Sequence, residues 1–157
     1  MATSTLIQFL GDGITSPTGA GADTMNRRQV ETFISGAAIA AGDVVMLDTS
    51  KTGADRALYI KQCANVGTGN PLAVGVALDA AAAAGEQVRV VVSGYVEGVD
   101  CQNGTILIGA ALSAGKTAAG EVDTAAAGDT AGLFAVALEA KGATTANKVA
   151  IHILKRF

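Results

Sequence analysis

The sequence has almost no large aromatic side chains. Tryptophan is absent, and aromatic residues make up only 4% of the 157 residues. Because large side chains bury most of the apolar area of a folded core, a core of alanine, valine and isoleucine is thin. We therefore expect the subunit to gain stability from outside itself, by oligomerisation or by docking on a larger surface. The same scarcity counts against a sugar-binding site, which usually presents aromatic faces.

Positive charge is also scarce. Lysine and arginine total 11 against 14 acidic residues, which gives a formal net charge of −3. Nucleic-acid binding needs a basic face, so we expect no nucleic-acid partner. No apolar run approaches the roughly 18 residues of a membrane span, and no signal peptide is visible at the N-terminus. Synthesis in a cytoplasm follows as an expectation, with Cys63 and Cys101 as reduced thiols, although the sequence leaves a disulfide open.

Residues that carry chemistry are few and scattered. The one histidine, His152, lies in an apolar strand pattern, which favours a surface or packing position over a catalytic one. Residues 109–117 look like a phosphate-binding loop, but five residues separate the two glycines where the motif has four. Asp79 and Glu139 occupy equivalent positions of an internal repeat, and each is best explained as ending a strand and accepting local backbone hydrogen bonds. We expect no enzyme, no cofactor and no metal site.

The first 28 residues differ from the rest. They are rich in glycine, and they show no sustained period of 2 or 3.6 residues. We interpret residues 1–28 as an extended arm that becomes ordered on contact with a partner, with a frayed terminus as the alternative. The short apolar patch at residues 6–10 favours an arm that docks. Residues 29–157 are expected to form a single domain.

Short segments rich in valine and bounded by glycine predict β-strands. We expect them at residues 29–34, 44–48, 57–62, 72–79, 86–93, 95–101, 105–108 and 149–154. Asn103-Gly104 predicts a tight hairpin between two of them, because a type I′ turn needs positive φ at both central residues. The alanine-rich segment 77–84 predicts one helical turn or a short helix, although so short a helix is marginal in isolation.

An internal repeat relates the two parts of the domain. Residues 75–80 with 88–92 match residues 135–140 with 149–153, and residues 35–42 match residues 108–115. The half-repeats therefore run over about 35–92 and 108–154. Two similar halves suit a pseudo-symmetric barrel or sandwich, which reduces exposed strand edges. We predict the all-β class and a compact β-barrel with at most one or two short helices.

At residues 35–45, 73–90 and 93–98 the sequence resembles the capsid cement or head decoration proteins of tailed bacteriophages. The similarity covers roughly residues 29 to 154. It implies a β-tulip-like barrel, a homotrimer, and a position on the outer surface of the virion capsid after synthesis in the host cytoplasm. It also implies the major capsid protein as partner, with an N-terminal arm that pairs with capsid strands by β-augmentation.

The expected function is that of a structural virion protein that stabilises contacts between capsid subunits by mass action. The expected capsid-binding residues are those of the arm: Thr3, Ser4, Thr5, Leu6, Ile7, Gln8, Phe9 and Leu10. Residues 80–84 are candidates for trimer contacts. Three alternatives stay open: a ligand-binding or glycan-binding barrel, another minor virion component such as a head-fibre base or tail protein, and an enzyme that uses Asp79 and Glu139.

Overall fold

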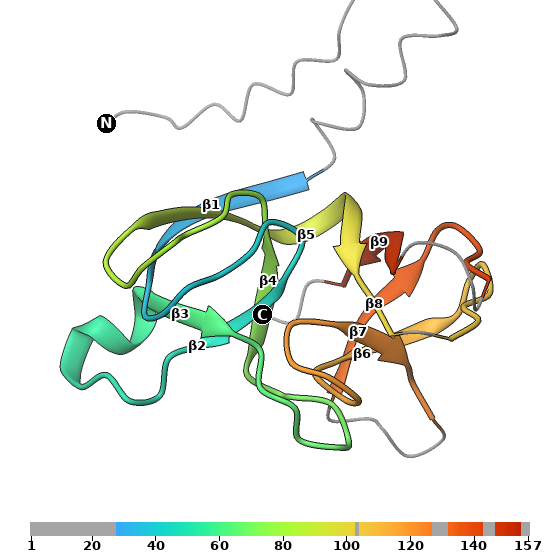
Figure 1. Ribbon diagram of the computed structural model, residues 1–157, viewed down its shortest axis with the longest axis horizontal. Helices are drawn as coiled ribbons and strands as arrows, with labels where there is room; N and C mark the ends of the chain where they lie inside the picture. Colours follow the sequence, from blue (N-terminus) through green and yellow to red (C-terminus); the bar gives the residue numbers. More distant parts are fainter. Residues whose placement is uncertain (1–27, 103, 127–131, 143–146, 155–157) are drawn as a thin grey trace, which may run out of the picture.

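The computed structural model describes residues 28–102, 104–126, 132–142 and 147–154. Within these ranges the fold consists of β-strands and one short 3₁₀ helix, η1, so the predicted all-β class is confirmed (Figure 1). The elements are β1 (Arg28–Ser35), β2 (Val44–Leu47), η1 (Gly53–Ala57), β3 (Tyr59–Gln62), β4 (Ala73–Ala77), β5 (Gln87–Asp100), β6 (Ala111–Ala114), β7 (Val122–Thr124), β8 (Leu133–Ala137) and β9 (Lys148–Ile153).

The first five strands close into a barrel. Their order is β1-β3-β2-β4-β5, and β5 pairs back with β1. The β1–β3 pair is parallel and short, whereas the other pairs in the ring are antiparallel. Closing the sheet on itself removes most of the exposed edges that a flat sheet of five strands would have.

Strand β5 belongs to both halves of the molecule. It has 14 residues and is continuous, although the sequence predicted two separate strands there. Its N-terminal part pairs with β1 and β4, and its C-terminal part pairs with β9. The order then continues as β9-β8-β6-β7, and a parallel bridge between Cys101 and Val122 brings the end of β5 back beside β7. Each half thus forms its own ring, and the two rings share β5.

Equivalent backbone hydrogen bonds recur in the two halves. The amide of Gly42 donates to the carbonyl oxygen of Ala77 at 2.9 Å, and Gly109 donates to Ala137 at the same distance. The predicted match of residues 75–92 with 135–153 agrees with this pairing. The predicted match of residues 35–42 with 108–115 is wrong, because the counterpart of Gly42 is Gly109 and not Gly115. Both segments consist of glycine, alanine and isoleucine or leucine, so composition alone did not fix their alignment.

Two apolar clusters make up the core. The barrel cluster (Phe33, Ile39, Val45, Ile60, Ala77, Ala81, Val88 and Val90) draws on every strand of the first ring and therefore fills its interior. The larger cluster contains side chains from both halves and joins them. In β2, Val45 belongs to the barrel cluster, while Val44 and Met46 belong to the larger one. Burial of both faces explains why β2 reads as a continuous apolar run.

Two local predictions are wrong. Residues 77–84 form no helix, because Ala81 is buried and exchanges two backbone hydrogen bonds with Ile39 at 2.8 and 2.9 Å. These long-range bonds outweigh the helix propensity of a segment too short to nucleate a helix alone. The hairpin between 95–101 and 105–108 is also absent: Ile106 pairs with Lys141, and the end of β5 pairs with β9. Asn103 itself lies outside the described residues.

Candidate functional site

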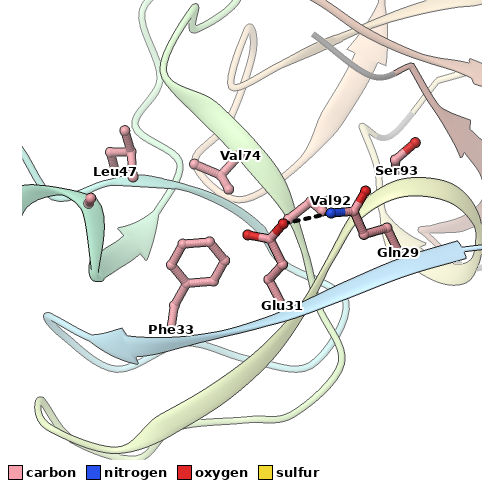
Figure 2. Close-up of a pocket in the computed structure, with 8 residues that line it drawn as sticks. Gln29, Glu31, Phe33, Leu47, Val74, Val92 and Ser93 are labelled. Atoms are coloured by element: carbon pink, nitrogen blue, oxygen red, sulfur yellow. Dashed lines mark hydrogen bonds between the residues drawn. The ribbon is translucent and has the colours of Figure 1, made fainter. Parts of the chain in front are cut away.

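A pocket of about 440 Å³ opens at one end of the first barrel (Figure 2). We call it the barrel pocket. Strands β1, β2, β4 and β5 and the helix η1 all contribute to its wall. The lining residues are Gln29, Glu31, Phe33, Leu47, Ala57, Val74, Val92 and Ser93.

The floor of the barrel pocket is formed by Phe33 and Val74, and β1 contributes its alternate residues to the pocket. Successive side chains of a strand point to opposite faces, so Gln29, Glu31 and Phe33 share one face. Figure 2 shows all three on the side of β1 that faces Val74, with the Gln29 side chain turned toward Glu31. Phe33 is only 8% exposed and belongs to the barrel cluster, and Val74 packs against that cluster.

A bulge in β5 shapes the wall of the barrel pocket. Gln29 pairs with Ser93 and Val30 pairs with Val91, so Val92 is an extra residue opposite β1. A bulge of this kind re-aims neighbouring side chains. As a result both Val92 and Ser93 line the pocket, although they are adjacent in sequence.

The rim of the barrel pocket is polar but offers little chemistry. Gln29 donates from Nε2 to Oε1 of Glu31 at 2.8 Å. Glu31 is the single titratable group among the lining residues, so the pocket has no pair of groups for general acid–base catalysis. Among the described residues there is also no cluster of three or more histidine, cysteine or acidic side chains that would hold a metal ion. The arrangement is suited to binding an apolar group.

One edge of β1 has no described strand beside it along residues 28–33. The amide of Ile34 donates to the carbonyl oxygen of Leu58, on the β3 side, and Ser35 donates to Glu86, on the β5 side. Because backbone groups alternate along a strand, those of Val30 and Thr32 point to the same side as those of Ile34. The β1–β3 pairing covers only Ile34 and Ser35, so no described strand lies beside residues 28–33 on that side.

Asp79 and Glu139 each bind backbone in their own half. Asp79 accepts hydrogen bonds from the main chain and the guanidinium group of Arg89, and this pairing lowers the pKa of Asp79 to about 2. Glu139 accepts a hydrogen bond from the amide of Ala150 at 2.8 Å. The predicted equivalence of the two carboxylates and their strand-ending role are confirmed. Each carboxylate therefore accepts hydrogen bonds from its own half of the molecule.

The other candidate residues from the sequence lie in strands or in the core. His152 is exposed on β9, where it pairs with Tyr95 and Val136. Residues 111–114 form β6, so the segment that looks like a phosphate loop is extended and its amides do not converge. Cys63 and Cys101 are free and buried, and burial raises the pKa of the Cys63 thiol to about 12.

The second half carries an exposed apolar pair. Leu107 and Ile108 are 67% and 69% exposed, the highest values among the large apolar side chains that the structure describes. The hydrogen bond from Gly109 to Ala137 places them beside Leu138, which is 45% exposed. We call these three residues the apolar patch. In the first half the residues before Gly42 are alanines, so the patch is specific to the second half.

The predicted capsid-binding residues lie outside the described residues. Thr3 to Leu10 belong to residues 1–27, and nothing in the described ranges tests them. Sequence reasoning missed the barrel pocket. The available signal was β1 itself, where polar side chains stand on both faces at residues 29–32, a pattern more typical of an exposed edge than of a core strand.

The chain matches no protein-family model and no curated protein. Among solved structures it is similar to the N base of the head fiber protein gp8.5 of bacteriophage phi29. The TM-score is 0.53 at 17% identity, and the match covers 82% of this chain and 95% of that chain. At this identity the likeness shows a shared fold. In the part of the chain that the structure describes, no helix is long and apolar enough to cross a membrane.

Proposed function

We propose that this protein is a structural component of a phage virion that binds the outside of the head. The observation that carries the proposal is the shared fold with the head fiber base of phage phi29, over 82% of this chain. The resemblance to capsid decoration proteins in residues 29 to 154 points to the same setting. The lining of the barrel pocket, with one titratable group, supports a role in binding over one in catalysis.

Within the virion, the favoured role is that of a decoration or cement protein. Its partner is the major capsid protein, and it acts as a homotrimer. The arm residues Thr3 to Leu10 bind the shell, and the apolar patch provides a second contact, either with the shell or between subunits. Exposed apolar residues that stand together commonly mark an interaction surface. A protein that binds only the assembled shell stabilises it by mass action.

The second candidate is a head-fibre base, which the structural neighbour favours by its own description. Copy number separates the two roles. Quantitative mass spectrometry of gradient-purified virions would give this protein in amounts comparable to the major capsid protein if it tiles the shell. A few copies per particle would assign it to a fibre or tail. Absence from the particle would overturn both.

A binding assay tests the contacts. Shells assembled without this protein are mixed with the full chain, with a variant lacking residues 2–25, and with Leu107→Ser/Ile108→Ser. We expect both variants to keep the β-sheet circular dichroism signal of the full chain and to bind shells at least tenfold more weakly. The matched control is Ala40→Ser/Ala41→Ser, at the equivalent loop of the first half. If the truncated chain binds shells as tightly as the full chain, the arm is not a shell-binding segment.

A further inference from the structure

We propose that residues 5–10 of this chain dock as an added strand on the free edge of β1, with the side chains of Ile7 and Phe9 in the barrel pocket. This docked state belongs to the free protein, before it meets a shell. It rests on the proposed function only for the later role of the arm, which would have to leave the pocket in order to bind the shell.

The free edge supplies the backbone half of the site. The amide and carbonyl groups of Val30 and Thr32 point to the side where no described strand lies. Val30 is also 40% exposed, which is high for a valine within a strand. An added strand would hydrogen-bond to these groups, as in β-augmentation, where main-chain bonds give affinity and pockets give specificity.

The barrel pocket supplies the side-chain half. It lies against the face of β1 formed by Gln29, Glu31 and Phe33, directly beside the free edge. Leu47 and Ala57 form the wall on the opposite side from β1, and Figure 2 shows the space between Leu47 and β1 open above Phe33. Side chains that alternate along an added strand would enter this space, and its volume of about 440 Å³ suits two large apolar groups.

The chain itself offers the occupant. Residues 1–27 precede β1, and the chain reaches β1 at Arg28, next to Gln29 at the rim of the pocket. Residues 11–27 connect the apolar segment to β1, and this length allows the chain to reverse and pair antiparallel with β1. In an extended segment Ile7 and Phe9 share one face, while Gln8 lies between Leu6 and Leu10 on the other. The face with Ile7 and Phe9 is entirely apolar, and it therefore fits an apolar pocket.

Amide hydrogen exchange by NMR on the full chain tests the docking. The variant Ile7→Ala/Phe9→Ala removes the pocket-facing side chains, and Leu6→Ala/Leu10→Ala removes two large apolar side chains from the opposite face. We expect the amides of Val30 and Thr32 to exchange at least tenfold faster in the first variant than in the full chain, and at the unchanged rate in the second. Equal exchange in the full chain and the Ile7/Phe9 variant would overturn the proposal.

Two further measurements identify the occupant and separate this proposal from the function. Slow exchange that persists at the lowest concentrations, in a sedimenting monomer, supports docking of the chain's own segment. Slow exchange that disappears on dilution would assign the pocket to a second copy and overturn the proposal. Shell binding is scored separately with the same proteins. Slow exchange without shell binding removes the proposed function and leaves the docking, whereas shell binding without slow exchange removes the docking.

Discussion

The buried ammonium group of Lys141 donates to the carbonyl oxygen of Gln102 at 2.7 Å and also to that of Gly104 at 3.3 Å. Lys141 is only 4% exposed, and its counterpart in the first half is Ala81. At this equivalent position the first half therefore carries a methyl group. The second half carries a charged side chain that donates hydrogen bonds to two loop carbonyl groups.

Replacing Lys141 should destabilise the protein. In Lys141→Met the two carbonyl oxygens lose their buried donor, and we expect a loss of about 1–3 kcal/mol in the free energy of unfolding. Urea denaturation measures this loss. The control is Lys148→Met, since Lys148 pairs with Asp100 on a partly exposed surface, where removal of an ion pair costs less than about 1 kcal/mol. Equal losses of stability in the two variants would contradict the role of Lys141 as a buried hydrogen-bond donor.

Gly75 should not tolerate a methyl group. A Cβ at this position would run into the carbonyl oxygen of Val91 and the side chain of Val90, both on the neighbouring strand β5. We expect Gly75→Ala to cost about 2 kcal/mol or more through overpacking. The counterpart in the second half is Ala135, and Ala135→Gly should cost only about 0.5–1 kcal/mol. Thermal unfolding of both variants compares them, and a neutral Gly75→Ala would show that β4 and β5 can move apart freely.

Asp79 should make a small contribution to stability that depends on pH. Its side chain accepts hydrogen bonds from Arg89, so its pKa in the folded protein, about 2, lies below the unfolded value of about 3.9. A lowered folded pKa contributes stability above the unfolded pKa, and this stability is lost as the pH falls from about 4 toward 2. The pair is partly exposed, so the effect is below about 1 kcal/mol.

The pH prediction is checked by melting temperature. Asp79→Asn should be slightly less stable than the wild-type chain at pH 6, and the difference should vanish near pH 2. Arg89→Gln should behave in the same way, because it removes the other partner. A difference that grows toward acid pH would reverse the sign of the linkage and contradict the pairing.

Cys63 should be inert in the folded protein. The thiolate is the reactive form, and burial raises the pKa of this thiol to about 12. Cys101 is buried as well, and burial also raises the pKa of its thiol. We expect neither thiol to react with a disulfide reagent at pH 8 on the timescale of minutes, and both to react at once in denaturant. Rapid labelling of one thiol in the native protein would indicate local opening of the larger core cluster.

The sequence was informative where side chains alternate or repeat over many residues. The valine-rich segments correctly predicted β1, β2, β4 and β9. The match of residues 75–80 with 135–140 indicated the duplication, and it placed Asp79 and Glu139 at the equivalent positions that their hydrogen bonds show. Sequence reasoning failed where long-range pairing decides the outcome. The pairing of Ile106 with Lys141 replaced a local hairpin, and the bonds between Ile39 and Ala81 replaced a helix.

The site was harder to predict than the fold. The barrel pocket depends on a bulge at Val92 and on β1 separating from β3 before Ile34, and neither has a signature in the order of residues. The single histidine and the absence of a catalytic motif led us to expect a binding role over a catalytic one, and this stays a prediction. The location of the pocket required the register of β1 against two neighbouring strands.

The shared strand has a consequence for how the molecule comes apart. Because β5 is one continuous strand with its first part in one ring and its last part in the other, neither ring is complete without it. If the chain were divided before or after β5, one half would lack a strand of its ring. The two halves are therefore not separable modules, even though they repeat the same arrangement. Load applied to one ring therefore passes into the other along the covalent backbone of β5.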